Sequence, residues 1–98
     1  MPAMHYTVRW PDATVSTCYS PSLVIQDFFE PGRDYLLEDF LRRVREATHI
    51  ASERVRAKFG FACSMAADQL AVTEEKAARF AGQPDAVVQM VSFDTAPA

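Results

Sequence analysis

Apolar and polar residues alternate at the start of the chain as they do in a half-buried β-hairpin. In the first segment the apolar residues occupy every second position, at Met4, Tyr6, Val8 and Trp10. This period of two predicts a strand with one face in the core. A turn is expected at Pro11-Asp12-Ala13, because proline fixes φ and an aspartate side chain can bond the backbone two residues on. Residues Val15–Tyr19 alternate less regularly and predict the returning strand, at an edge of the sheet.

The next stretch combines a short helical turn with a change of direction. Ser20-Pro21-Ser22 ends the hairpin, and either serine can cap a short turn of helix over residues 23–28. Glu30-Pro31-Gly32-Arg33 predicts a turn, since proline disfavours helix at the residue before it and glycine accepts a positive φ. We expect Asp34 to be the N-cap of the long helix that follows.

A helical period dominates the middle of the chain, between Leu37 and Phe59. Apolar positions recur there at steps of three and four, at Leu37, Phe40, Leu41, Val44, Thr48, Ala51, Val55 and Phe59. This spacing predicts a helix of about six turns with one face in the core. Such a helix is about 34 Å long whereas a seven-residue strand spans about 23 Å, so one end of the helix should extend past the sheet.

Gly60 predicts the end of this helix, because glycine is the preferred residue just after a helix C-terminus. A second helix is predicted beyond it, with an apolar face at Ala62, Ala66, Leu70, Thr73, Ala77 and Phe80. A single helix kinked at Gly60 is the alternative that stays open. Ala86–Phe93 predicts the last strand, with Met90 and Phe93 on opposite faces.

Together these elements predict an α+β fold in the order ββααβ, a three-stranded antiparallel sheet with a long helix pair packed on one face. The 98 residues suffice for one modest core, so residues 1–98 are expected to form a single domain. The uncovered sheet face, where we expect Thr7, Ser16 and Cys18, and the overhanging helix end predict a partner. That partner is either a second copy in a homodimer or another protein.

The composition argues against some classes of partner and indicates a cellular compartment. A net charge of −3 lacks the basic excess of general nucleic-acid-binding proteins, so no nucleic-acid partner is expected. The chain has no apolar run near the roughly 18 residues of a membrane span and no signal-peptide pattern, which predicts a cytoplasmic protein without a membrane partner. Cys18 and Cys63 are too few for a disulfide framework and lack the spacing of a metal site, so we expect reduced, packed thiols.

The polar side of the long helix carries a cationic stripe. Its members are spaced three and four apart and are Arg42, Arg45, His49, Ser52 and Arg56. With Cys63 nearby, Arg42, Arg45, His49 and Arg56 form a candidate binding site for an anion or small molecule. Glu38, Glu46 and Glu53 lie within one helical turn of these arginines, so a solvated, ion-paired face is the competing interpretation.

No catalytic residue is predicted. His49 and Cys63 would make a base and nucleophile pair only if the two helices brought them together. Antiparallel pairing about Gly60 instead sets Cys63 opposite Arg56 or Ala57, two turns from His49. The sequence also lacks a Gly-rich phosphate loop, a metal-ligand motif and a nucleophile elbow, so no cofactor is expected.

Three segments resemble the small nitrogen starvation response family of bacterial proteins. They are residues 4–12 (MHYTVRWPD), 18–22 (CYSPS) and 51–64 (ASERVRAKFGFACS). The resemblance implies a gene cluster that encodes a nitrilase, a radical-SAM protein, an acetyltransferase, a synthase-like ATP-binding protein and a flavin oxidoreductase. It implies no catalytic residues.

On this resemblance we expect a small cytosolic accessory or regulatory protein in nitrile or cyanide nitrogen metabolism, non-catalytic and bound to a product of the nitrilase cluster. The alternative function is an anion or small-molecule binder, enzymatic or not, that uses the arginine stripe.

Overall fold

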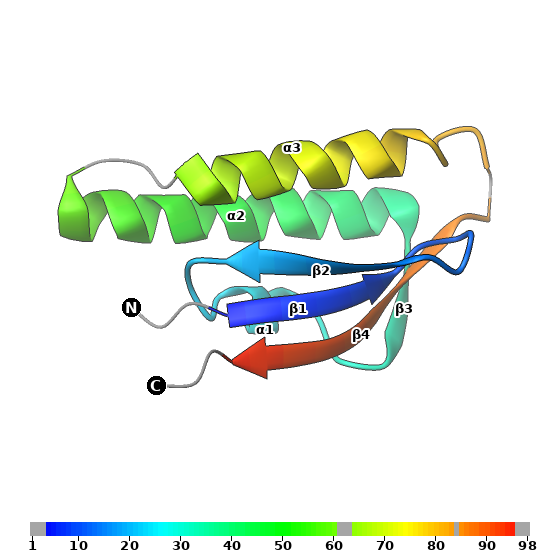
Figure 1. Ribbon diagram of the computed structural model, residues 1–98, viewed down its shortest axis with the longest axis horizontal. Helices are drawn as coiled ribbons and strands as arrows, with labels where there is room; N and C mark the ends of the chain where they lie inside the picture. Colours follow the sequence, from blue (N-terminus) through cyan, green and yellow to red (C-terminus); the bar gives the residue numbers. More distant parts are fainter. Residues whose placement is uncertain (1–3, 61–63, 84, 96–98) are drawn as a thin grey trace.

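A computed structural model describes residues 4–60, 64–83 and 85–95, which fold into an antiparallel sheet and a layer of helices on one of its faces (Figure 1). The strands are β1 (Met4–Arg9), β2 (Val15–Ser20), β3 (Arg33–Leu36) and β4 (Val87–Thr95). The helices are α1 (Ile25–Phe28), α2 (Leu37–Phe59) and α3 (Ser64–Ala78). The α+β class, the antiparallel sheet and the long helix pair are therefore confirmed.

The sheet has four strands in the order β2-β1-β4-β3, so the prediction of three strands is wrong. The additional strand, β3, lies where the sequence predicted a turn and a helix N-cap at Asp34. It pairs antiparallel with β4 and buries Tyr35. Leu36, not Asp34, is the N-cap residue of α2, and no side chain caps this helix end. The backbone N–H of Leu37 instead donates to the carbonyl oxygen of Ala86 at 3.0 Å.

A bulge changes the alternation of β4. Thr7 pairs with Ser92 but the next residue of β1, Val8, pairs with Met90, which leaves Val91 as the extra residue. Beyond an extra residue the side chains of a strand change faces. Met90 is fully buried and Phe93 also packs against the core, so the prediction that they lie on opposite faces is wrong.

The core lies between the helix layer and one face of the sheet, with Trp10 near its end. The Trp10 ring meets Phe40 of α2 edge-on at 5.7 Å between centroids, and stacks on Phe80 at 6.2 Å. Its indole N–H donates to Ser16 Oγ at 2.9 Å. One aromatic side chain thus joins the end of β1, the long helix and the segment after α3, with its polar atom satisfied.

Helix α2 begins after Leu36 rather than after the predicted N-cap at Asp34, and it ends at Gly60 as predicted. Gly60 adopts φ +81°, and its N–H donates to the carbonyl oxygen of Arg56 at 2.8 Å. A separate helix begins at Ser64 and runs back beside α2, so the chain forms two helices rather than one helix kinked at Gly60. Residues 61–63 lie outside the described part of the chain. The C-terminal end of α2 extends past the strands, as its length predicted (Figure 1). No helix among the described residues is long and apolar enough to cross a membrane.

Candidate functional site

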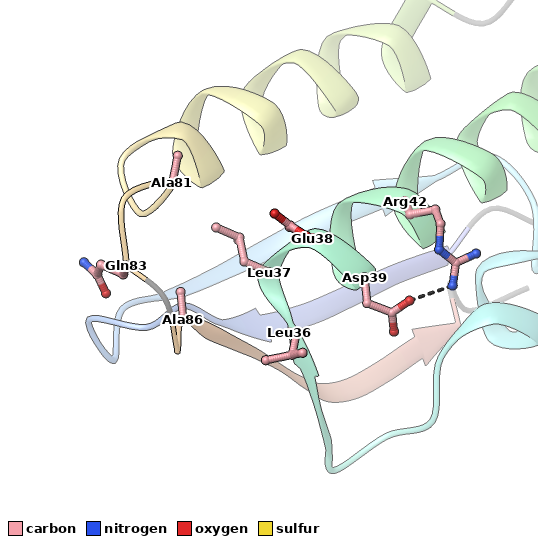
Figure 2. A pocket seen from close by; sticks show the side chains of 8 residues that line it. All are labelled: Leu36, Leu37, Glu38, Asp39, Arg42, Ala81, Gln83 and Ala86. Carbon is pink, nitrogen blue, oxygen red and sulfur yellow. Dashed lines mark hydrogen bonds and ion pairs between the residues drawn. The ribbon is translucent and has the colours of Figure 1, made fainter.

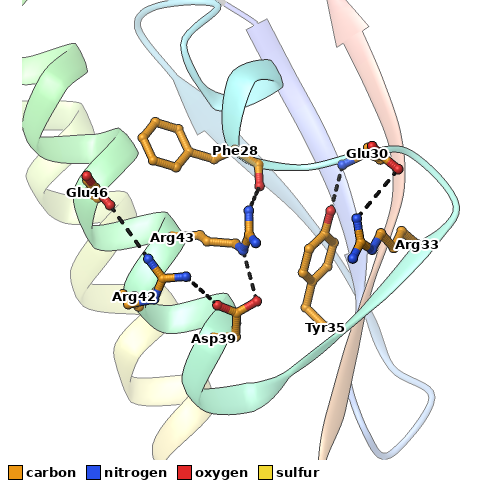
Figure 3. A network of polar contacts seen from close by, with 8 residues as sticks. All are labelled: Phe28, Glu30, Arg33, Tyr35, Asp39, Arg42, Arg43 and Glu46. Atoms are coloured by element: carbon orange, nitrogen blue, oxygen red, sulfur yellow. Dashed lines mark hydrogen bonds and ion pairs between the residues drawn. The ribbon is translucent and has the colours of Figure 1, made fainter.

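Two members of the predicted cationic stripe are ion-paired. Arg42 lies 2.6 Å from Asp39 and 3.9 Å from Glu46, one turn away on either side (Figure 3). Arg45 reaches across to α3 and pairs with Glu74 at 2.9 Å. These arginines therefore already have carboxylate partners, as in the ion-paired interpretation of the stripe.

Two further members, His49 and Arg56, have no carboxylate partner among the residues that the structure describes. The side chains of His49 and Arg56 are exposed and make no ion pair or hydrogen bond with any residue that the structure describes. All four side chains lie along one outer face of α2, as their spacing predicts. Cys63, the fifth residue of the predicted site, falls in the segment 61–63 outside the described residues.

Arg42 also lines a depression of about 510 Å³ at the N-terminal end of α2. Figure 2 shows Glu38 and Asp39 beside it, with the guanidinium turned toward Asp39. The remaining lining is Leu36, Leu37, Ala81, Gln83 and Ala86. The depression is lined by two carboxylates, Glu38 and Asp39, and one guanidinium, Arg42, so it has no net positive charge that would attract an anion.

Arg43, which lies outside the predicted site, links α2 to other elements more extensively than Arg42, Arg45, His49 or Arg56 does. Its Nε donates to Asp39 at 2.9 Å and its Nη1 to the carbonyl oxygen of Phe28 at 2.7 Å (Figure 3). The guanidinium also lies 5.2 Å from the ring centroid of Tyr35. Hydrogen bonds from Arg43 and then Arg42 hold the pKa of Asp39 below its usual value. Arg43 therefore joins α2 to the end of α1 and to β3.

Arg54 has a similar role about one and a half helical turns from the end of α2. Its Nη1 donates to Ser22 Oγ at 3.0 Å, and that oxygen also accepts from the backbone N–H of Val24. Ser20 and Ser22 are both buried. Arg43 and Arg54 are eleven residues apart, close to three helical turns, so both project from the flank of α2 that faces the β2–α1 connection. Helical spacing relates these two positions, but only the position of α1 reveals their contacts.

Cys18 is buried on the helix-covered side of the sheet, opposite Tyr6, so the expectation that it lies on the open face is wrong. Ser16, two residues earlier, faces the same side. Burial raises the pKa of the Cys18 thiol to about 11, although hydrogen bonds from Tyr6 and Thr73 act in the opposite direction. A thiol with this pKa is almost entirely protonated at neutral pH and is a poor nucleophile or metal ligand.

The free end of the helix pair exposes two large apolar side chains. Phe59, the last residue of α2, is 54% exposed, and Met65 in the first turn of α3 is 58% exposed. Basic residues adjoin them: Arg56 is exposed, and the ammonium of Lys58 lies 5.6 Å from the centroid of the Phe59 ring. We call Arg56, Lys58, Phe59 and Met65 the helix-pair end.

The model of a family described as "Nitrogen starvation-induced protein NitG" matches residues 5–93. This span runs from β1 almost to the end of β4. The chain belongs to the NitG family. The prediction of a nitrogen starvation response family is thus confirmed, and the description places the protein in the response to nitrogen starvation. No curated protein and no solved structure matches the chain.

The two histidines and the one cysteine that the structure describes in this NitG-family protein lie on different surfaces. His5 is exposed on the open sheet face, His49 on the outside of α2, and Cys18 within the core. Within residues 4–60, 64–83 and 85–95, no three side chains of His, Cys, Asp or Glu cluster in a way that could hold a metal ion. The described part instead offers exposed surfaces at the helix-pair end and on the sheet.

Proposed function

We propose that the protein is a non-catalytic accessory protein of the cytoplasm that serves nitrile or cyanide nitrogen metabolism during nitrogen starvation. It acts by binding a second protein, the product of a gene in the same nitrilase cluster. The observation that carries the proposal is the helix-pair end, where Phe59 and Met65 are exposed next to basic side chains.

Covering a large exposed apolar side chain with a partner contributes favourably to the free energy of binding. Aromatic residues are frequent among the few residues that dominate the binding energy of an interface. Burying Phe59 and Met65 would remove apolar surface from water at a position that no strand supports. The adjoining Arg56 and Lys58 would pair with acidic side chains at the rim of the contact. We therefore infer that the partner offers an apolar groove bordered by Asp or Glu. The inference follows the local positive charge of Arg56 and Lys58 and not the net charge of the chain, which is −3.

The dispersal of the reactive groups supports the non-catalytic part of the proposal. A base and a nucleophile must lie within hydrogen-bond reach of each other. Here the two histidines occupy different layers, and the Cys18 thiol is buried with a pKa of about 11. This arrangement favours a binding protein over an enzyme.

The test is binding of the purified protein to each purified cluster product, first the nitrilase, by isothermal titration calorimetry. Replacing Phe59→Ser and Met65→Ser together should weaken binding at least 10-fold, about 1.4 kcal/mol or more. Arg56→Glu with Lys58→Glu should weaken it and reverse its salt dependence. Val72→Ser is the matched control, because Val72 is 61% exposed on α3 away from the helix-pair end. If no cluster product binds, or if all variants bind alike, the proposal fails.

A second candidate function, binding of a small anion along the stripe of α2, is favoured by the unpaired state of His49 and Arg56 among the described residues. Arg42, Arg45 and Cys63 would complete that site. Thermal shift in phosphate at constant ionic strength tests it, with Arg45→Ala and Arg56→Ala as variants. An unchanged shift in both variants would exclude the stripe, whereas loss of the shift in both would support it.

A further inference from the structure

The sheet face opposite the helices is not covered by any described element, and its register creates ordered rows of side chains. In one row His5 of β1 lies beside Asp94 of β4. In the next, Thr7 lies beside Ser92. His5 and Asp94 are exposed, and the Thr7 row between the charged rows carries only short side chains. The face therefore has a basic and an acidic residue side by side, next to a central row of short side chains.

The third row repeats the order of charge across the sheet. Arg9 of β1 pairs with Gln89 of β4, and Gln89 pairs with Asp34 of β3. Arg9 and Asp34 are exposed, and neither has an ion pair within the described residues. In both rows the basic residue, His5 or Arg9, stands on β1, and the acidic residue, Asp94 or Asp34, stands on β4 or β3. The face is thus polarised across the strands.

We propose that this face binds a second copy of the chain, sheet against sheet, about a two-fold axis that runs parallel to the strands between β1 and β4. Rotation about that axis places β1 over the partner's β4. Each row of side chains then lies over the same row of the partner. His5 then faces the partner's Asp94, and Arg9 faces the partner's Gln89, with the partner's Asp34 one strand away. Both contacts occur twice, as in any isologous dimer.

The charges also distinguish this arrangement from the other two-fold stacking. An axis across the strands would place each β1 over the partner's β1 and the His5 row over the Arg9 row. His5 would then face the partner's Arg9 rather than an acidic side chain, so neither basic residue would meet a carboxylate, which disfavours that arrangement. The parallel axis also brings Thr7 over Ser92, so the short central row permits close approach of the two backbones. Stacked sheets with nearly aligned strands are a standard packing, with a layer spacing of about 10 Å.

The size of the face indicates a weak dimer. Four strands at about 4.8 Å and six residues at about 3.3 Å give a face of roughly 19 by 20 Å. Two such faces cover roughly 760 Å² in total, below the roughly 1,200 Å² at which standard specific interfaces begin. We expect a reversible dimer with a dissociation constant on the order of 10 μM to 100 μM, in the range of transient contacts of this size.

Sedimentation equilibrium tests the dimer between about 5 μM and 1 mM, concentrations that bracket that affinity. The wild-type mass should rise from 11.0 kDa toward twice that value. His5→Glu and Asp94→Lys should each remain monomeric, since the first places Glu opposite the partner's Asp94 and the second removes the carboxylate that faces the partner's His5. An equimolar mixture of the two variants should dimerise again, because Glu at position 5 then faces Lys at position 94 and the partner's His5 faces Asp94. Glu75→Lys, which changes the charge as much as Asp94→Lys does but on the exposed side of α3, should dimerise like the wild type.

A wild-type chain that stays at 11.0 kDa throughout this range would overturn the proposal. So would a dimer that His5→Glu and Asp94→Lys leave intact, since it must use another surface, and so would a mixture that stays monomeric. Far-UV circular dichroism establishes that each variant is folded before its mass is interpreted. The inference does not rest on the proposed function, because the sheet face and the helix-pair end are separate surfaces and their variants are separate.

Discussion

The side-chain carbonyl oxygen of Gln69 on α3 accepts a hydrogen bond from the backbone N–H of Tyr19 on β2 at 3.0 Å. The amide nitrogen of Gln69 donates to Thr73 Oγ1 at 3.2 Å, and Thr73 in turn contacts the Cys18 thiol. Because β2 is an edge strand, its outward N–H groups would otherwise be open to another chain. One glutamine thus fixes the second helix to the sheet and occupies part of this edge.

Replacing Gln69 by leucine should destabilise the protein by about 1 kcal/mol, because it removes two hydrogen bonds and leaves the buried Thr73 hydroxyl one partner short. The free energy of unfolding in urea measures this cost, and hydrogen exchange at the Tyr19 amide should become faster. Gln26→Leu is the control, since Gln26 is exposed on α1 and its side chain makes no hydrogen bond with a described residue. Unchanged exchange at Tyr19 would contradict the role given to Gln69.

Neighbouring arginines of α2 should differ sharply in their effect on stability. Arg43→Ala should cost about 1.5 to 3 kcal/mol, because it breaks a charge-assisted bond to Asp39 and a bond to the Phe28 carbonyl group and uncovers Tyr35. Arg42→Ala should cost less than about 0.5 kcal/mol, since its ion pairs are at the surface. Their side chains are 29% and 62% exposed, respectively. Urea unfolding of both variants decides this, and equal costs would show that Arg43 is not a tertiary link.

The same contrast extends to the stretch Arg54-Val55-Arg56. Arg54→Ala should lower the free energy of unfolding by about 1 kcal/mol, because Arg54 holds Ser22 in the buried β2–α1 connection. Arg56→Ala should leave stability within about 0.5 kcal/mol of the wild type, as for other exposed surface positions. Thermal unfolding of both variants measures this. If Arg56→Ala proved the more destabilising of the two, the division of the flanks of α2 would be wrong.

The body of the long helix and its end at Gly60 could be predicted because their evidence is local, whereas the predicted N-cap at Asp34 was wrong. Six turns of apolar spacing repeat the same signal, and a glycine with a positive φ follows at Gly60. Strand β3 could not be predicted, since four residues with one buried side chain, Tyr35, give no measurable period. It is a strand only because β4, more than fifty residues later, supplies its hydrogen-bond partners.

Non-local structure also explains why the candidate residues divided as they did. Helical spacing placed Arg42, Arg45, His49 and Arg56 on one face, but it could not show that Glu74 of α3 reaches Arg45. Nor could it show that the neighbouring flank, with Arg43 and Arg54, contacts α1 and the connection before it. The bulge at Val91 depends on how β1 and β4 pair, and a simple alternation of residues does not contain that information.

The end of α2 allows a test of backbone conformation with little side-chain interference. Gly60→Ala should destabilise the protein by about 1 kcal/mol, because an L-residue at φ +81° is strained although nothing lies within 4 Å of the added Cβ. Gly82→Ala meets equally open space without a positive φ, so its cost should be near zero. The difference in melting temperature between the two variants isolates the left-handed conformation. Equal melting temperatures would show that α2 does not depend on Gly60 to end.

The buried thiol of Cys18 should make stability fall in alkaline solution. Its pKa rises from 9.0 to about 11 on folding, chiefly through burial, so the unfolded chain loses this proton at lower pH than the folded one. Stability attributable to Cys18 is therefore fully present below pH 9 and is lost as the pH rises toward 11. A difference of about two pKa units corresponds to a loss on the order of 2 kcal/mol. Burial raises the pKa of Tyr6 as well, which adds to the loss above pH 10.

Urea unfolding of wild type and Cys18→Ala between pH 8 and pH 10.5 separates the two contributions, since both proteins contain Tyr6. The wild type should lose stability more steeply above pH 9, whereas Cys18→Ala should begin less stable, because it leaves a cavity, and decline less. In a Cys63→Ser background, which leaves Cys18 as the only thiol, an aromatic disulfide reagent should react at pH 8 at least about 100-fold more slowly than with the urea-unfolded chain. Parallel pH profiles for wild type and Cys18→Ala, together with fast labelling of the folded chain, would show that this thiol is accessible and ordinary.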